Sequence, residues 1–380
     1  MKLRSKLPQV GTTIFTVMTA LSNKHGAINL SQGFPDFDVD SGLIERVNHH
    51  MRCGHNQYAP MPGVVLLRQR LAAKTLETHG ARYDAETEIT VTAGATEAVF
   101  AAISATVHRG DEVIILEPAY DAYAPAVALN GGVAVYCSLT YPEYAVDWDA
   151  VHRAVSGKTR MIILNSPHNP SGAALTEQDM TALTELTRGT EILILSDEVY
   201  EHIIFDGLRH ESMSRYPELI RRSFVIGSFG KTYHATGWKT GYCLAPAELT
   251  AELRRVHQFL VFTSNTPIQC AYADFMADRQ TYLSLAAFYQ KKRDRFLGLI
   301  KSSRFRALPC RGTYFAMLDY SAISHEPDLA FARRLITEHK VAAIPPSVFY
   351  HGGDDHRVLR FCFAKHDQTL EEAAERLCRI

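Results

Sequence analysis

The stretch that decides the fold is Gly227-Ser228-Phe229-Gly230-Lys231-Thr232-Tyr233. It continues a short apolar run, 223–227, whose length and β-branched content predict a buried strand. Burial of a lysine at the end of such a strand lowers the pKa of its ammonium and leaves a nucleophilic amine near neutral pH. Such an amine forms Schiff bases with carbonyl compounds. A solvated surface lysine is the commoner alternative for this motif alone, so the interpretation depends on residues elsewhere in the chain.

Length and composition predict an ordinary globular protein. A chain of 380 residues predicts two domains, or one large α/β domain with an appendage. With 21% charged residues and a formal net charge of −1, it has no basic field for nucleic acid or an anionic membrane. We find no apolar run of the roughly 20 residues that cross a bilayer, and no secretory signal. The 7 cysteines are odd in number and include no Cys-x-x-Cys, which predicts reduced thiols in a cytoplasmic protein and argues against metal ligation.

From residue 87 onward, apolar strands alternate with helices. Strands are predicted at 88–92, 112–116, 160–164 and 191–195, each followed by small or polar residues. This alternation predicts an α/β fold with a mostly parallel sheet flanked by helices. Ligands of such sheets bind outside the carboxyl ends of the strands. The polar residues expected at that edge are Thr96, Tyr120, Asn165, Asn169, Asp197 and Tyr200.

The two ends of the chain are expected to pack around this sheet. Residues 14–21 form an amphipathic run, and a brief strand from Ile28 leads to the turn Gly33-Phe34-Pro35, where backbone N–H groups are free for a ligand unless this is a plain loop. Residues 247–301 are largely helical. Shorter strands at 313–317, 341–344 and 358–363, with helices at 328–338 and 369–379, then predict a smaller α+β domain.

The constellation of side chains suits pyridoxal phosphate (PLP), which needs an amine, a counter-charge for its ring nitrogen, a phosphate cradle and positioning of the ring. Asp197, at the end of an apolar strand, would face the ring nitrogen, because a buried carboxylate needs a cationic partner; a helix N-cap is the alternative role. Tyr200 and Asn169 are candidate donors to the ring phenolate, and Tyr120 is a candidate to stack on the ring. The candidates for the phosphate are Ser228, Lys239 and the backbone at Ala95 and Thr96, where small residues open a helix.

Arg360 lies within the apolar strand 358–363. A guanidinium there must be paired, and its planar fork suits the α-carboxylate of a substrate. An internal salt bridge is an equally good interpretation of the strand alone.

Together these residues resemble the fold-type I PLP-dependent aminotransferases, in the group of the kynurenine- and glutamine-type transaminases. The resemblance covers nearly the whole chain. It is carried by Gly11-Thr12-Thr13-Ile14-Phe15, Ser31-Gln32-Gly33-Phe34-Pro35-Asp36-Phe37, Asn56-Gln57-Tyr58, Pro167-His168-Asn169-Pro170, Asp197-Glu198-Val199-Tyr200, Gly237-Trp238-Lys239 and Arg360-Phe361-Cys362-Phe363-Ala364-Lys365.

The resemblance implies a large domain (28–275) with a mostly parallel seven-stranded sheet, a smaller α+β C-terminal domain (276–380), and an N-terminal arm (1–27) that packs with the small domain. It also implies a homodimer with shared active sites. For the cofactor it implies an aldimine at Lys231, Asp197 at the ring nitrogen, Asn169 and Tyr200 at the phenolate, Tyr120 on the ring, and Ala95, Thr96, Ser228, Lys239 and the second subunit's Tyr58 at the phosphate. For the substrate it implies Arg360, Asn165 and the Gly33 backbone at the carboxylate, and Phe15 with Phe262 of the other subunit at the side chain.

The implied activity is ping-pong transamination from methionine or an aromatic amino acid to a 2-oxo acid. Lys231 would move the proton between the α-carbon and the cofactor. No second arginine is evident for a distal carboxylate, which argues against aspartate as the substrate. Two alternatives stay open, a β-lyase acting on cysteine conjugates and a PLP-binding regulatory protein. The segment 351–356, rich in His and Asp, is interpreted as a solvated turn, so no metal site is expected.

Overall fold

A seven-stranded sheet forms the centre of the computed structural model, which describes residues 3–8 and 10–380. In spatial order its strands are β2 (Ile89–Thr92), β8 (Gly241–Leu244), β7 (Ser223–Ser228), β6 (Leu193–Asp197), β5 (Thr159–Asn165), β3 (Glu112–Glu117) and β4 (Val133–Ser138). Strand β8 runs antiparallel to both its neighbours, and every other neighbouring pair is parallel. The predicted α/β fold with a mostly parallel sheet is therefore confirmed.

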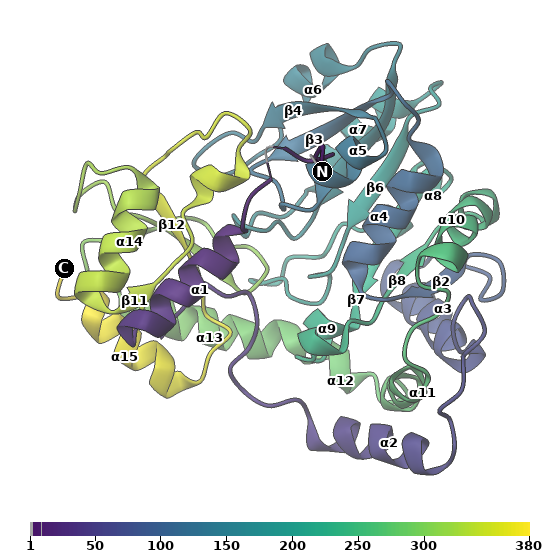
Figure 1. Cartoon of the computed structure of the whole chain (residues 1–380), viewed down its shortest axis with the longest axis horizontal. Helices are drawn as coiled ribbons and strands as arrows, with labels where there is room; N and C mark the ends of the chain where they lie inside the picture. Colours follow the sequence, from purple (N-terminus) through teal and green to yellow (C-terminus); the bar gives the residue numbers. More distant parts are fainter. Residues whose placement is uncertain (1–2, 9) are drawn as a thin grey trace.

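Alternating side chains of the inner strands face two apolar layers. Val113 and Ile115 of β3 pack in one layer, whereas Ile114 and Leu116 pack in the other. This period of two follows from the pleat, and burial on both faces explains the continuous apolar runs. One layer holds α4 (Ala95–Thr106), α5 (Tyr123–Leu129) and α10 (Ala247–Leu260); the other holds α3 (Val65–His79), α6 (Trp148–Ala154), α7 (Glu177–Thr187) and α11 (Thr266–Phe275) (Figure 1).

A smaller α+β unit lies beside this sheet (Figure 1). Strands β12 (Val358–Cys362), β10 (Phe315–Asp319) and β9 (Arg306–Ala307) form an antiparallel sheet, packed with α13 (Leu285–Leu299), α14 (Asp328–His339) and α15 (Asp367–Leu377). The N-terminal helix α1 (Ile14–His25) packs against α14, and β1 (Ile28–Asn29) pairs with β11 (Val341–Ala342). The remaining elements are α2 (Ser41–Arg52), η1 (Met213–Arg215), α8 (Pro217–Ile220), α9 (Phe229–Thr232), η2 (Thr236–Trp238), α12 (Gln280–Leu283) and η3 (Pro346–Phe349).

The structure adds two strands that the sequence analysis did not predict, β9 in the small sheet and β4 at the edge of the large sheet. Residues 133–137 are as continuously apolar as the inner strands, so the run itself offered a signal for this strand; Val133 is nevertheless 50% exposed because β4 lies at the edge. The strand expected at 313–317 begins two residues later, at Phe315, because Thr313 has a φ of 65°, outside the β region.

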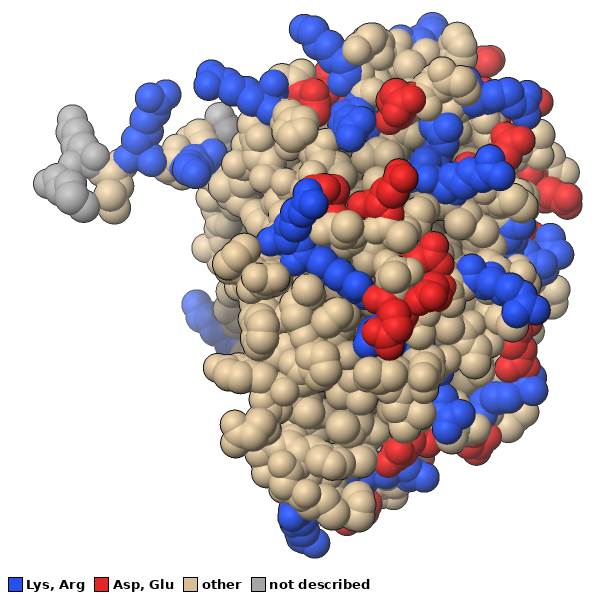
Figure 2. Space-filling view, turned by 90° about the vertical axis from the view of Figure 1, so that its right-hand side faces the viewer, with Lys and Arg blue, Asp and Glu red and all other residues tan. Residues whose placement is uncertain are grey.

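The surface divides into charged and uncharged areas. Figure 2 shows Lys, Arg, Asp and Glu gathered over the upper and right-hand parts of one face, whereas its lower left part is largely uncharged. This face belongs to the side of the molecule on which α3, α10 and α11 lie (Figure 1). Several large apolar side chains of α2, α3, α10 and the segment after α10 are exposed: Met51, Val65, Leu66, Phe259, Leu260 and Phe262. Within the described residues, no helix is long and apolar enough to cross a membrane.

Candidate active site

Lys231 lies in α9, the single helical turn that follows β7. Its Nζ donates hydrogen bonds to the carbonyl oxygen of Gly33 at 3.1 Å and to the hydroxyl of Tyr314 at 2.9 Å. Neither acceptor is a carboxylate, so burial dominates and lowers the pKa of Lys231 to about 8. The structure therefore holds a lysine that is readily converted to the neutral, nucleophilic amine.

Asp197 ends β6 and is buried, with only 6% of its surface exposed. The Tyr123 hydroxyl donates to its Oδ2 at 2.7 Å, and the Val199 N–H donates to its Oδ1 at 3.3 Å. In the described part of the chain, no lysine, arginine or histidine makes an ion pair with it. Burial raises the pKa of Asp197, and the hydrogen bond from Tyr123 only partly offsets this effect. Asp197 does not cap a helix, so the alternative role expected for it is wrong.

The start of α4 forms an anion-binding corner. Gly94 precedes the helix with a φ of 82°, and no side chain caps the first N–H groups, at Ala95 and Thr96. Close packing keeps this corner small, since a Cβ on Gly241 would lie 2.7 Å from the Ala95 nitrogen. The ammonium of Lys239 lies 3.3 Å from the place a Cβ on Gly94 would occupy. Free N–H groups, the helix dipole and an ammonium all favour a bound phosphate.

Arg360, in β12, is 1% exposed and makes no salt bridge with any described carboxylate, so the internal ion pair considered from the sequence is wrong. Its guanidinium donates to the Oδ1 of Asn169 and to the carbonyl oxygen of Ser31, both at 2.8 Å, and its Nε has no partner. The guanidinium carbon lies 4.0 Å from the ring centroid of Phe315 and 5.2 Å from that of Phe15. Burial lowers the pKa of Arg360 to about 10. A buried cation without an anion is costly, so this site favours an external carboxylate.

Most of the residues predicted for the site line one cavity of about 190 Å³ at the carboxyl edge of the sheet. These are Ala95, Thr96, Tyr120, Asn165, Asn169, Asp197, Tyr200, Ser228, Lys231 and Lys239. Hydrogen bonds and ring contacts connect Gly33, Arg360 and Phe15 to this group. The Asn165 amide donates to the carbonyl oxygen of Asp197 and accepts from the Asn169 N–H, so it ties two neighbouring loops together.

Tyr58 and Phe262 lie apart from this cavity in the single chain. They are 83% and 41% exposed, and their rings contact each other at a centroid distance of 5.4 Å. Phe262 has a φ of 67°, uncommon for a bulky residue.

Sequence reasoning missed two tyrosines that hold the central groups, Tyr123 at Asp197 and Tyr314 at Lys231. Tyr123 follows Tyr120 by three residues and begins α5, a spacing that offered a signal. Tyr314 is 83 residues from Lys231 in the chain, and nothing local marks it.

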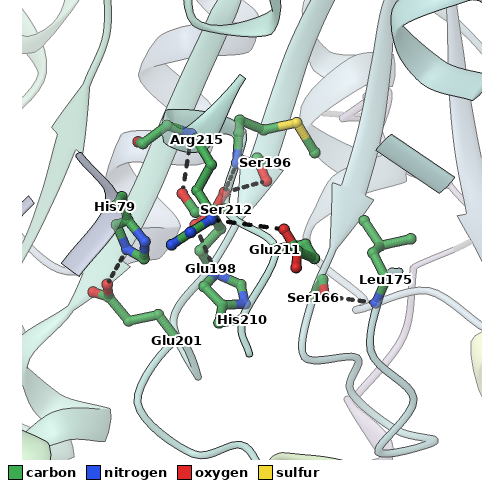
Figure 3. Close-up of polar contacts among 12 residues, drawn as sticks. His79, Ser166, Leu175, Ser196, Glu198, Glu201, His210, Glu211, Ser212 and Arg215 are labelled. Carbon is green, nitrogen blue, oxygen red and sulfur yellow. Dashed lines mark hydrogen bonds and ion pairs between the residues drawn. The ribbon is translucent and has the colours of Figure 1, made fainter. Parts of the chain in front are cut away.

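A buried polar network lies behind the site, around the segment that follows β6 (Figure 3). Glu198 accepts from the Ser196 hydroxyl at 2.9 Å and the Met213 N–H at 3.0 Å, and contacts the Nε2 of His210 at 2.8 Å. Glu201 accepts from Lys74 at 2.5 Å. Burial raises the pKa of Glu201, but Lys74, His202 and His79 together outweigh burial and hold that pKa well below the usual value. Both carboxylates therefore anchor the segment that carries Asp197 and Tyr200.

The fold and the site together define an α/β enzyme with a lysine, a buried carboxylate and an anion corner at one sheet edge, and with an arginine contributed by β12 of the small unit. Comparison with known proteins agrees: the family model for aminotransferase class I and II matches residues 25–377. The chain belongs to the class I and II aminotransferases, and the predicted aminotransferase activity is confirmed.

Individual relatives are similar over nearly their full length. The chain is 52% identical to methionine aminotransferase of Escherichia coli over 378 residues, which is 99% of this chain and 98% of the relative. It is 33% identical to kynurenine–oxoglutarate transaminase of Dictyostelium discoideum, covering 97% of this chain and 94% of the relative. Among solved structures, the E. coli protein YbdL, identified as a methionine aminotransferase, superposes with a TM-score of 0.98 at 51% identity, with both chains fully covered. The motifs quoted from the sequence resemble those of bacterial methionine aminotransferases in particular, and this finer resemblance is also confirmed.

Proposed function

We propose that this chain uses pyridoxal 5'-phosphate to move the amino group of methionine or an aromatic amino acid to a 2-oxo acid. The main support is the environment of Asp197. This carboxylate is buried, has no basic partner among the described residues, and lines the same cavity as Lys231. The similarity to methionine aminotransferase of E. coli supports methionine as the substrate, and the similarity to a kynurenine–oxoglutarate transaminase supports an aromatic one.

The residues present fit this cofactor at three points. Asp197 has no cationic partner among the described residues, and a protonated pyridine nitrogen would supply one. The corner at Ala95 and Thr96, with Lys239 and Ser228 beside it on the cavity, suits a phosphate. Tyr200, Asn169 and Tyr120 line the space between these two points and are assigned to the ring and its phenolate oxygen.

When bound, pyridoxal phosphate supplies an aldehyde for the amino group and an electron sink for the α-carbon. Lys231 would hold this aldehyde through its Nζ, and as a free amine it would accept and return the α-proton. The hydroxyl of Tyr314 and the carbonyl of Gly33 position the Nζ of the free amine. Asp197 would hold the proton on the ring nitrogen, and Tyr123 fixes the Asp197 carboxylate by its hydrogen bond.

We assign the substrate α-carboxylate to Arg360, whose Nε has no partner. Arg360 also bonds Asn169, so carboxylate binding and ring binding are linked through one side chain. The basic side chains that line the described cavity, Lys231 and Lys239, are both assigned to the cofactor. This leaves no cation for a distal carboxylate and favours an uncharged substrate side chain beside Phe15. Asn165 and the backbone at Gly33 are assigned to the same carboxylate.

We further propose a cytoplasmic homodimer in which Tyr58 and Phe262 of one protomer complete the cavity of the other. Their exposure in the single chain and the uncharged area in Figure 2 support this arrangement. The division into an arm (1–27), a large domain (28–275) and a small domain (276–380) belongs to the same proposal, although β1 pairs with β11 of the small unit.

Relative kcat/KM values for methionine, phenylalanine and aspartate with a panel of 2-oxo acids test the substrate. We expect methionine or phenylalanine to exceed aspartate by at least about 100-fold, because a second carboxylate would be buried without a cation. A preference for aspartate would refute the assignment. Lys231→Ala should lose both transamination and the visible absorbance of the lysine-bound cofactor. Release of pyruvate and ammonia from cysteine conjugates without a 2-oxo acid would favour the β-lyase alternative.

A further inference from the structure

A cluster of histidine and cysteine side chains lies where α2 packs against α11, outside the cavity described above. His50, near the end of α2, is buried; His55, in the following loop, is exposed; Cys270 of α11 is half-buried. One potential ligand atom from each of the three lies within 4.8 Å of the others. The Nδ1 atoms of His50 and His55 are 2.8 Å apart.

Asp274 orients the buried histidine of this cluster. Its Oδ2 lies 2.8 Å from the Nε2 of His50. A carboxylate at that distance keeps the ring proton on Nε2, so Nδ1, which contacts the Nδ1 of His55, keeps its lone pair. This carboxylate–histidine arrangement recurs behind the ligands of protein metal sites, where it fixes the tautomer and raises the basicity of the ligand.

We propose that His50 Nδ1, His55 Nδ1 and Cys270 Sγ bind a zinc-class divalent metal ion, with a fourth position open to water. A set of two imidazoles and a thiolate binds Zn²⁺ in preference to Mg²⁺ or Ca²⁺. At Zn–N bonds of about 2.0 Å, tetrahedral ligand nitrogens lie about 3.3 Å apart. The exposed His55 ring therefore needs to move outward by only a few tenths of an ångström. Binding releases the thiol proton of Cys270, and His55 carries its remaining proton on Nε2.

The ion would join the loop after α2 to α11. That loop continues to Tyr58, and it is already tied to α11 by the bond from the Thr266 hydroxyl to the carbonyl oxygen of Gln57 at 2.7 Å. A bound metal would therefore stabilise the segment that presents Tyr58. This proposal departs from the expectation that no cysteine of this chain binds metal, because only the fold brings Cys270 near the two histidines.

The chain contains a matched control. Cys53 directly follows α2, and its Sγ lies 3.6 Å from the Nε2 of His49. This Cys–His pair is exposed and is not part of the three-ligand group. Isothermal titration of the cofactor-loaded protein with Zn²⁺ should show one ion per chain. We expect Cys270→Ser and His50→Ala to weaken binding at least 10-fold, and Asp274→Asn to weaken it by about 10- to 100-fold through the orientation of His50. Cys53→Ser should leave the affinity unchanged.

Two further measurements separate this site from loss of structure or adventitious binding. Co²⁺ should give thiolate–cobalt bands in the wild type and in Cys53→Ser but not in Cys270→Ser. Saturating Zn²⁺ should raise the Tm of the wild type and leave that of Cys270→Ser unchanged, provided that the two have the same Tm without metal. Absence of saturable Zn²⁺ binding, or binding that Cys270→Ser leaves intact, would overturn the proposal.

Discussion

At the scale of single residues, the unusual groups of the site are charges that burial leaves uncompensated. Lys231 and Asp197 line the cavity at the edge of the large sheet, and Arg360 reaches the same cavity from β12 through its bond to Asn169. In the described residues, none of the three makes an ion pair with another. Such groups are expensive to bury, and perturbed groups of this kind cluster at functional sites.

The first prediction concerns the pH dependence of Lys231. Burial lowers its pKa from 10.5 to about 8, so in cofactor-free protein the neutral amine should appear as the pH rises through about 8. We expect the rate at which borohydride traps pyridoxal on Lys231 to rise with that midpoint, and Lys231→Ala to trap none at this position. A midpoint near 10.5 would contradict the buried amine.

The lowered pKa of Lys231 also makes the free energy of unfolding depend on pH. Because the folded state disfavours the charged form, the penalty is fully present below about pH 8 and fades as the pH approaches 10.5. Lys231→Met should therefore stabilise cofactor-free protein against urea at pH 7, and this advantage should shrink by pH 10.

The second prediction concerns Arg360. Arg360→Lys keeps the positive charge but loses the planar fork that bonds Asn169 and Ser31 while leaving Nε free. We expect kcat/KM for the amino donor to fall by about 100-fold, or about 2.7 kcal/mol, with the cofactor still bound. As a control, Arg306→Lys changes an exposed arginine paired with Asp319 and should alter kcat/KM by less than about 2-fold. An unchanged kcat/KM in Arg360→Lys would exclude the carboxylate role.

At the scale of elements, β7, which leads directly into the turn that carries Lys231, packs tightly against β8. A Cβ on Gly227 of β7 would lie 2.6 Å from Cε1 of the Tyr242 ring. Gly227→Ala should therefore destabilise the protein by about 1–3 kcal/mol through overpacking. Gly298→Ala, in α13 with open space around the new Cβ, is the control and should stabilise by about 0.5–1 kcal/mol. Urea unfolding midpoints of the two variants would settle the contrast.

The buried network in Figure 3 supports a fourth prediction. Lys74 and Glu201 form a buried pair with side chains 4% and 7% exposed. Glu201→Gln leaves the Lys74 ammonium buried without an anion, so we expect a loss of about 3–5 kcal/mol in the free energy of unfolding.

The matched control for this network is Glu375→Gln, which breaks an exposed pair with Arg379 and should change the free energy of unfolding by less than about 0.5 kcal/mol. Equal effects of the two substitutions would show that the network does not stabilise the segment after β6.

At the scale of the whole molecule, the proposed dimer predicts that active sites are shared. Mixing Lys231→Ala with Tyr58→Ala should form hybrid dimers in which one cavity holds both intact residues. Neither parent variant alone forms such a cavity, so we expect the mixture to regain activity toward a quarter of the wild-type level. The control is a mixture of Lys231→Ala with the double variant Lys231→Ala/Tyr58→Ala, which should regain none. If the mixture contains hybrid dimers but no activity returns, Tyr58 acts within its own chain.

Local sequence alone determined the fold class and the site residues that end the parallel strands. Asn165, Asp197 and Ser228 each end an apolar parallel strand, and since carboxyl ends of adjacent parallel strands meet at one edge, their convergence follows from the order of strands. Only the tertiary structure decided which partners complete them. Tyr314 at Lys231, Asn169 at Arg360 and Cys270 near His50 are brought together by packing between distant segments. Periodicity records which face of an element is buried, but it carries no information about which remote side chain will lie opposite that face.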